Sequence, residues 1–324
     1  MSAARLRLWC RGVVQGVGFR PLVHRLAAEL QLVGEVENVA GAVRLELQGE
    51  RRSLELLLRR LPEALQPPGA LEPLAPEWLP PLVPAPPGLR IAAASAQPLG
   101  AGLIAPSLAA DLAPCPTCLA ELHDPANRRY RYPFISCSQC GPRYSIATAA
   151  PYARAHTSLA GFRLCALCQQ EFDDPADRRF HAETIACPAC GPQLQWQGAG
   201  DGGGDPLAAA LALLAAGGIL ALQGVGGFQL LVDVSNGAAV ARLRQRKQRP
   251  AKPLALLVAD LQAIAPLVEL SELERLQLQH PAAPIVLLRL RSGQRQPFAG
   301  VAPGSAALGM MLPASPLHQL LAAG

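Results

Sequence analysis

CPTC at residues 115–118 and CSQCGP at 137–142 recur as CALC at 165–168 and CPACGP at 187–192, fifty residues further along the chain. The segment between the cysteine pairs recurs at the same offset, as DPANRRY from residue 124 and DPADRRF from residue 174. An offset that several motifs share indicates a duplicated module. The middle of the chain is therefore predicted to fold as two copies of one small unit.

Each copy of the module supplies four cysteines with the spacing Cys-x2-Cys-x18-Cys-x2-Cys. Two Cys-x-x-Cys turns can direct four thiolates at one tetrahedral ion, and four protein ligands leave no open position for catalysis. We therefore expect two structural zinc ions. Their predicted ligands are Cys115, Cys118, Cys137 and Cys140 in the first copy and Cys165, Cys168, Cys187 and Cys190 in the second. Pairing between the copies, redox-active dithiols and an iron–sulfur cluster are the alternatives.

The composition favours a multidomain protein of a reducing compartment. The 324 residues suffice for two or three domains, and 50% of them are hydrophobic against 16% charged. Eight of the nine cysteines lie in Cys-x-x-Cys pairs, which is typical of metal sites in the cytoplasm rather than of secreted disulfide proteins. The uncharged run at 206–232 contains five glycines, so helix and strands are favoured over a membrane span. We expect a cytoplasmic location and no membrane contact.

Residues 1–95 have the pattern of a small α+β domain. The predicted order is strand 5–13, helix 21–32, strands 33–39 and 42–48, helix 53–61 and a closing strand at 89–94. This order is that of the split βαβ unit of ferredoxin-like folds. Ten prolines between 62 and 87 allow only an edge strand or a loop there.

A glycine-rich loop separates the first predicted strand from the first helix. Its residues are Gln15, Gly16, Val17, Gly18, Phe19 and Arg20. Gly16 and Gly18 allow backbone conformations that turn several N–H groups toward one anion, and the helix start adds its dipole. Arg20 can bind the same phosphate through two N–H groups. A glycine turn beside a solvated arginine is the alternative. Asn38, before a hairpin turn, is either a turn residue or an amide that orients water.

Residues 12–20, Gly-Val-Val-Gln-Gly-Val-Gly-Phe-Arg, resemble the signature of the acylphosphatase family. The asparagine of that family, 18 positions after the arginine, falls on Asn38. The resemblance implies that Arg20 and the amides of the loop bind a phosphoryl group and that Asn38 positions the attacking water. Arg20 and Asn38 are thus the expected catalytic residues. Ala40 stands where an Asp-Gly turn is common in the family, and we expect little effect on the chemistry.

The rest of the sequence divides into linkers and further domains. Residues 96–112 and the glycine-rich segment 196–204 are predicted linkers on either side of a tandem finger module at 113–195. A third domain, at 205–324, alternates predicted helices at 207–216 and 235–248 with predicted strands at 219–222, 228–232, 254–258 and 285–290. No closing element is recognisable before Gly324, so this α/β domain is expected to be incomplete.

Five cations lie among the nine residues from Arg244 to Lys252, and both lysines of the chain, Lys247 and Lys252, are among them. Compact ammonium groups suit contacts with phosphate oxygens. A solvated helix end is the alternative, because runs of charge usually face water.

The acylphosphatase-type loop, the duplicated cysteine module and the α/β tail together resemble HypF, the carbamoyltransferase family of hydrogenase maturation. The tail is similar to YrdC-like nucleotide-binding domains, which implies that Lys247, Arg249 and Lys252 bind ATP as a substrate. Gln223 and Gln229 depart from the pattern, because relatives commonly have Lys and His there.

The HypF resemblance also implies a reaction sequence. Carbamoyl phosphate is hydrolysed at the acylphosphatase domain, and carbamate then reacts with ATP to give carbamoyl adenylate and pyrophosphate. A further domain, not contained in these residues, passes the carbamoyl group to the C-terminal cysteine of the partner HypE. We expect this chain to perform the first step and to hold part of the second.

Two other functions fit parts of the sequence. A zinc-ribbon module that binds RNA would explain the fingers and the basic run, but aromatic residues make up only 4% and the net charge is only +5. Nucleic-acid binding is therefore not expected. A free-standing acylphosphatase with accessory zinc would explain the N-terminal loop without the α/β domain.

Overall fold

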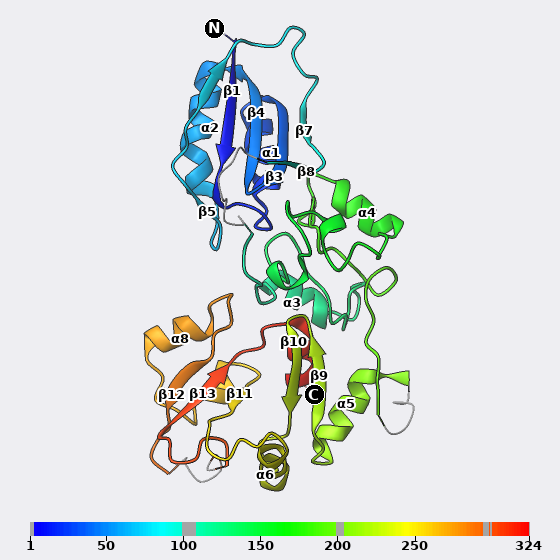
Figure 1. Ribbon diagram of the computed structural model, residues 1–324, viewed down its shortest axis with the longest axis vertical. Coiled ribbons are helices and arrows are strands. Elements are labelled where there is room, and N and C mark those ends of the chain that lie inside the picture. Colours follow the sequence, from blue (N-terminus) through cyan, green and yellow to red (C-terminus); the bar gives the residue numbers. More distant parts are fainter. Residues whose placement is uncertain (1–2, 99–107, 199–203, 294–297, 299, 324) are drawn as a thin grey trace. The chain divides into compact units, whose positions relative to one another are not determined.

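The computed structural model of the chain describes residues 3–98, 108–198, 204–293, 298 and 300–323. It divides into two compact units, one of residues 1–111 and 136–191 and the other of residues 112–135 and 192–324 (Figure 1). The two predicted linkers lie partly outside the described residues, at 99–107 and at 199–203. No helix in the described ranges is long and apolar enough to cross a membrane.

The first unit begins with a twisted sheet whose main path is β6-β1-β4-β3-β7, with β8 also paired to β3. Its strands are β1 (Ala3–Cys10), β3 (Val33–Ala40), β4 (Ala42–Glu50), β6 (Glu77–Leu79), β7 (Leu89–Ile91) and β8 (Ser95–Pro98). The helices α1 (Phe19–Glu29) and α2 (Arg51–Ala64) connect its strands (Figure 1). A separate two-stranded antiparallel sheet is formed by β2 (Gly12–Val13) and β5 (Ala70–Leu71).

The core of this domain follows from the alternation of buried apolar residues with more exposed residues along β1. Leu6, Leu8 and Cys10 are fully buried and belong to the same apolar cluster as Leu54 and Leu57 of α2. Alternate residues of a strand point to one face, and residues three apart on a helix share a side, so the two patterns meet in one core. Burial raises the pKa of Cys10 to about 12, which leaves this thiol protonated.

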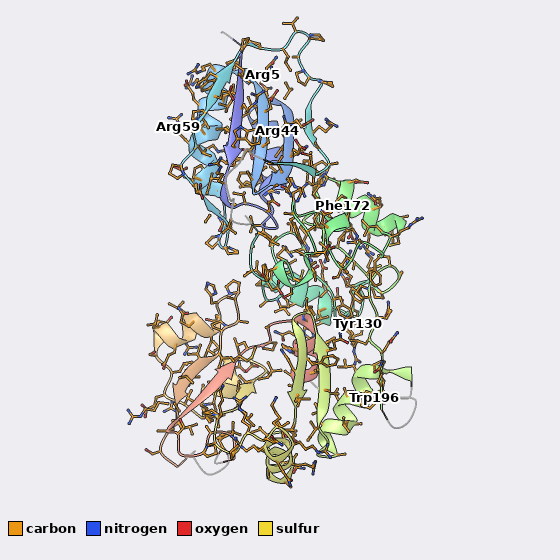
Figure 2. All side chains as sticks on the ribbon, in the orientation of Figure 1. Arg5, Arg44, Arg59, Tyr130, Phe172 and Trp196 are labelled. Atoms are coloured by element: carbon orange, nitrogen blue, oxygen red, sulfur yellow. The ribbon has the colours of Figure 1, made fainter. Side chains whose placement is uncertain are left out.

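The other face of the sheet carries paired charges. Arg44 donates to Glu35 at 2.9 Å and to Glu37 at 2.7 Å, and Arg5 pairs with Glu46 across β1 and β4. Figure 2 labels Arg5 and Arg44 on these strands. Opposite charges on neighbouring strands stabilise the pairing of the strands.

The closing strand of the ferredoxin-like order is β6 and not the predicted segment at 89–94. β6 pairs with β1 at residues 77–79, inside the proline-rich segment, and is an edge strand as the prolines require. Leu89–Ile91 forms β7, which pairs in parallel with β3 at the opposite edge. The helix α2 also extends beyond the predicted end at residue 61, and Pro62 lies within its last turn.

The remainder of the first unit consists of short elements around a small core. They are the 3-10 turns η1 (Tyr144–Ile146) and η2 (Arg154–His156) and the helix α4 (Ala166–Asp173). The core here contains two cysteines, Cys168 and Cys187, with Ala182 and Ile185. Two predicted metal ligands thus lie inside an apolar cluster, so we expect metal binding and folding to be coupled there.

The second unit contains the helix α3 (Pro116–His123) and the α/β region. The α/β region has a two-stranded sheet and a three-stranded sheet of order β11-β13-β12. Its elements are α5 (Pro206–Ala215), β9 (Leu220–Gly224), β10 (Gly227–Leu231), α6 (Gly237–Arg246), β11 (Ala255–Leu257), α7 (Leu261–Ile264), α8 (Glu272–Leu278), β12 (Val286–Arg289), β13 (Ala307–Met311) and α9 (Pro316–Ala322).

All six elements predicted for the α/β region are present, with bounds that differ by a few residues. Asn236 caps α6, because its side chain accepts from the N–H of Ala239 at 3.0 Å. The sequence did not predict the central strand β13 or the helices α7, α8 and α9.

Candidate phosphate-binding and metal sites

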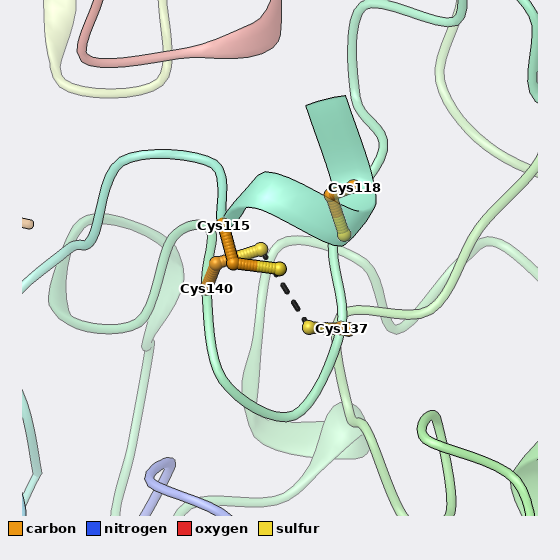
Figure 3. A group of neighbouring side chains, drawn as sticks. All are labelled: Cys115, Cys118, Cys137 and Cys140. Carbon is orange, nitrogen blue, oxygen red and sulfur yellow. Dashed lines mark hydrogen bonds between the residues drawn. The ribbon is translucent and has the colours of Figure 1, made fainter. Parts of the chain in front are cut away.

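The eight paired cysteines form two clusters, and each cluster comes from one copy of the repeat. Cys115, Cys118, Cys137 and Cys140 direct their sulfurs at one point (Figure 3), and Cys165, Cys168, Cys187 and Cys190 do the same. Within each cluster the sulfurs lie within 4.8 Å of one another. Pairing within each copy is thus confirmed, and pairing between the copies is excluded.

The geometry of both clusters suits a tetrahedral ion. The Sγ–Sγ distances are 3.7 Å for Cys137–Cys140 and 3.6 Å for Cys168–Cys190, close to the separation of about 4 Å that zinc–sulfur bonds require. A backbone hydrogen bond from Cys168 lowers the pKa of Cys165 to about 7, which favours the thiolate needed to bind a metal. Four thiolates fit one structural zinc ion in each copy.

The glycine-rich loop adopts the conformation that the sequence predicted. Gly16 and Gly18 have φ values of 73° and 71°, in the left-handed region, and Gly18 precedes the first residue of α1. A Cβ atom on Gly16 would lie 2.8 Å from Cδ of Arg143, so this position also requires glycine for space. The loop therefore leads directly to the positive end of a helix dipole.

The loop, Arg20 and Asn38 line one cavity of about 20 Å³, which is room for about one water molecule. Of the residues predicted to bind phosphate, Gly16, Gly18, Phe19 and Arg20 line it. The side chains of Gln15 and Val17 do not line this cavity.

Gln15 and Val17 have other places in the domain. Gln15 donates to the carbonyls of Val39 and Ala42, at 2.8 Å each, and Val17 is part of the apolar core. Their side chains therefore brace the loop.

Arg20 is buried and forms an ion pair with Glu183 at 2.5 Å. The side chain of Glu183 is only 8% exposed, and its second oxygen accepts from the backbone N–H of Arg154 at 2.9 Å. A carboxylate from the second copy of the repeat thus binds the guanidinium that was predicted to bind phosphate. This arrangement excludes the alternative of a solvated arginine.

The side-chain amide of Asn38 has a hydrogen-bond partner for its nitrogen but none for its oxygen among the described residues. Its Nδ2 donates to the carbonyl of Tyr152 at 2.8 Å, and its Oδ1 is buried without a partner among the described residues. A carbonyl can only accept, so the nitrogen must face Tyr152 and the oxygen is left for another donor.

Arg143, Tyr152 and Glu183 are among the lining residues of this cavity that were not predicted from the sequence. Arg143 is 2% exposed and donates to the carbonyls of Gly16, Cys137 and Cys140, which fixes the glycine loop to the first cysteine cluster. A comparison of the two copies could have pointed to two of these residues. Arg143 corresponds to Gln193 in the second copy, and Glu183 corresponds to Pro133 in the first, so both positions differ in charge between the copies.

His181 also lines the cavity. Burial lowers the pKa of its imidazole to about 4, so this ring is neutral near neutral pH. It packs edge-on against Phe172 and Phe180, which accounts for its position.

The basic segment of the second unit begins in the last turn of α6 and continues beyond the end of this helix. Lys247 and Lys252 are exposed, and Arg249 donates to the carbonyl of Lys252 at 3.2 Å. Arg244 is buried and donates to the carbonyls of Arg249 and Lys252, at 2.8 and 3.2 Å, so it holds the segment in a turn. Lys247 is thus the C-cap residue of α6, and Arg249 and Lys252 lie in the segment that follows this helix.

Comparisons with known proteins match each part of the chain. The acylphosphatase family model matches residues 6–79, and the model described as HypF finger matches residues 115–147 and 164–197. The Sua5/YciO/YrdC model, described as telomere recombination, matches residues 212–324.

Individual relatives agree with the family models. Carbamoyltransferase HypF2 of Cupriavidus necator is 51% identical over 320 residues, which are 98% of this chain and 39% of the relative. The acylphosphatase of Thermobifida fusca is 39% identical over 79 residues, which are 24% of this chain and 86% of the relative.

A solved structure gives the same result for the fold. Full-length HypF in its phosphate- and nucleotide-bound form is 36% identical and has a TM-score of 0.91, with 99% of this chain and 41% of that chain covered. This chain therefore spans about two fifths of the length of the HypF proteins that it matches. With an acylphosphatase domain, two HypF fingers and a YrdC-type domain in one chain, it belongs to the HypF family of carbamoyltransferases.

Proposed function

We propose that the chain hydrolyses an acyl phosphate, carbamoyl phosphate, at the cavity formed by the glycine loop, Arg20 and Asn38. The observation that carries this proposal is the convergence of these residues on one cavity at the N-terminus of α1. The first turn of α1 holds no acidic residue that would repel an anion. The phosphoryl group would bind to the guanidinium of Arg20 and to the N–H groups of the loop.

The open oxygen of Asn38 supports a role in orienting the attacking water. Its Nδ2 is bound to the carbonyl of Tyr152, so Oδ1 is the atom of the amide that can accept a hydrogen bond from water. A fixed acceptor holds the water's lone pair in line with the phosphorus, and such positioning is a main source of rate in phosphoryl transfer. Water attacks phosphorus, the phosphorus–oxygen bond to the acyl group breaks, and inorganic phosphate and carbamate leave.

The substrate must displace Glu183 from Arg20. A cavity of about 20 Å³ cannot hold a phosphoryl group beside the ion pair. Carboxylate and phosphate are both anions and compete for the same N–H groups, so the Arg20–Glu183 pair would open when the substrate binds.

We further propose that the YrdC-type domain uses carbamate and ATP to form carbamoyl adenylate, with Lys247, Arg249 and Lys252 toward the phosphates of ATP. The family supports this assignment, and the hydrogen bonds of Arg244 fix the backbone of the segment that carries Arg249 and Lys252. The carbamoyl group would pass to HypE through a longer protein of the family. We place the domains at 1–95, 113–195 and 205–324, and the eight thiolates suit a cytoplasmic protein.

Phosphate release from carbamoyl phosphate tests the proposal. The chain should release phosphate, and Arg20→Ala should lower the rate of release by about two orders of magnitude or more. Full activity of Arg20→Ala would end the proposal. Excess RNA should not compete, because neither the family nor the cavity favours the RNA-binding alternative.

A further inference from the structure

Tyr152 lies in the segment between the two finger matches, which end at residue 147 and resume at residue 164. Its backbone is bound on both sides by residues of the acylphosphatase domain. The N–H of Tyr152 donates to Oε1 of Gln15 at 2.8 Å, and its carbonyl accepts from Asn38 at 2.8 Å. These two contacts fix Tyr152 at the edge of the candidate site.

The hydroxyl of Tyr152 has no partner in the part of the chain that the structure describes. Tyr152 is only 4% exposed, and it lines the same cavity as Arg20, Asn38 and Arg143. Buried hydroxyl groups are nearly always hydrogen-bonded, since an unpaired one lowers stability. An unpaired hydroxyl in a cavity lined by two arginines therefore indicates a partner that arrives with a ligand.

The phenol is in the right protonation state to donate. Burial raises the pKa of Tyr152 to about 12, so the hydroxyl keeps its proton throughout the physiological range. The nearby charged groups that act on it include Arg143, Glu183, Arg20 and Asp111. A neutral donor among these groups suits an anionic oxygen rather than a cation.

We propose that Tyr152 is a substrate-contacting residue whose hydroxyl donates a hydrogen bond to an oxygen of the bound phosphoryl group. This inference rests on the proposed function of the cavity and extends it: the segment between the fingers completes the acylphosphatase site. The acylphosphatase domain supplies the loop, Arg20 and Asn38, and the finger region supplies the additional donor. No covalent step is assigned to Tyr152.

The test compares Tyr152→Phe with the unchanged 324-residue chain, using inorganic phosphate as the probe. Titration of each protein with phosphate gives Kd, and carbamoyl phosphate hydrolysis gives kcat and KM. We expect Tyr152→Phe to raise the Kd for phosphate and to lower kcat/KM, each about 10- to 100-fold, as for a lost hydrogen bond to a charged group. The denaturation midpoint should stay the same or rise, because no bond between described residues is lost.

Tyr132→Phe is the matched control. Tyr132 is 2% exposed, and its hydroxyl donates to the carbonyl of Pro192 at 3.2 Å. This variant should lose stability but keep phosphate affinity and hydrolysis. An unchanged Kd for phosphate in Tyr152→Phe would overturn the proposal, and so would a weaker Kd together with a lower midpoint, which would assign the hydroxyl to the fold. If the unchanged chain binds phosphate more tightly than Tyr152→Phe but does not hydrolyse carbamoyl phosphate, the proposed function is contradicted and the role of Tyr152 in binding phosphate is not.

Discussion

At the scale of single residues, the candidate site depends on side chains from distant parts of the sequence. The signature predicted Arg20 and Asn38, because local geometry sets both: one follows the loop and the other lies on β3. It did not predict Glu183, which lies 163 positions from its partner Arg20. An ion pair between residues so far apart in the sequence depends on how the second finger packs against the acylphosphatase domain. The spacing of residues along the chain does not reveal this packing.

Arg20→Ala should lower the rate of acyl phosphate hydrolysis by about two orders of magnitude or more, comparable to the loss of an oxyanion donor. The reason is the loss of the only arginine of α1 that lines the cavity. Phosphate release, measured with a phosphate sensor, checks this. Arg25→Ala, an exposed arginine of the same helix, is the control and should retain the full rate.

Asn38→Ala should reduce kcat more than it raises KM, because Asn38 acts on water rather than on the bound phosphoryl group. Steady-state kinetics with carbamoyl phosphate separates the two constants. A rise in KM alone would instead place Asn38 among the residues that bind substrate.

Glu183→Gln should lower KM for carbamoyl phosphate about threefold or more. Removal of the charge weakens the competitor for Arg20 and removes repulsion of the incoming anion. Glutamine retains an oxygen that can accept from the N–H of Arg154, so the turn should hold. Glu63→Gln, an exposed position, is the control. A higher KM in Glu183→Gln would show that Glu183 positions Arg20 instead of covering it.

At the scale of helices and strands, the pattern of apolar residues predicted most of the helices and strands of the two α/β-type regions but missed several, among them β6 and β13. β3 and β4 are short apolar runs on either side of the Ala40-Gly41 turn and were predicted almost to the residue. β6 has three residues among prolines, and its pairing with β1 is set by the packing of the domain. β13 was missed because its central position in the sheet depends on strands far away in the sequence.

Gly34→Ala should destabilise the acylphosphatase domain by about 2 kcal/mol or more. Gly34 has φ 137°, and a Cβ atom there would lie 2.0 Å from the backbone oxygen of Glu46 in the neighbouring strand. Denaturation followed by the fluorescence of Trp9 and Trp78 measures the change. Gly88→Ala is the control, since nothing lies within 4 Å of a Cβ atom at that position.

Cys187→Ser should reduce the zinc content from two ions per chain to one, because each copy of the repeat holds its own cluster. Metal analysis of the purified protein measures this. Cys10→Ala, at the one cysteine outside the clusters, should keep both ions. Loss of both ions in Cys187→Ser would contradict independent folding of the two copies.

At the scale of the whole molecule, the chain spans about two fifths of the length of its HypF relatives, so its parts need not perform every step of the family. We expect the 324-residue chain to release phosphate from carbamoyl phosphate but to support little carbamoyl-phosphate-dependent exchange of pyrophosphate into ATP. Lys247 and Lys252 are exposed, and high affinity for a nucleotide needs a ligand buried on most sides. Exchange at the rate of a full-length relative would contradict this expectation.

The two copies of the finger show how a duplication can divide labour within one chain. Their backbones match closely: the N–H of Arg131 bonds to Leu122 at 2.8 Å, and the N–H of His181 bonds to Phe172 at 2.9 Å, fifty residues later. The copies differ where Pro133 of the first corresponds to Glu183 of the second. Because each cluster is formed by its own four cysteines, one copy can carry a carboxylate that pairs with Arg20 of the candidate site while its four sulfurs stay in place. A difference at a single position of a duplicated module thus places a charge beside an arginine of a different domain.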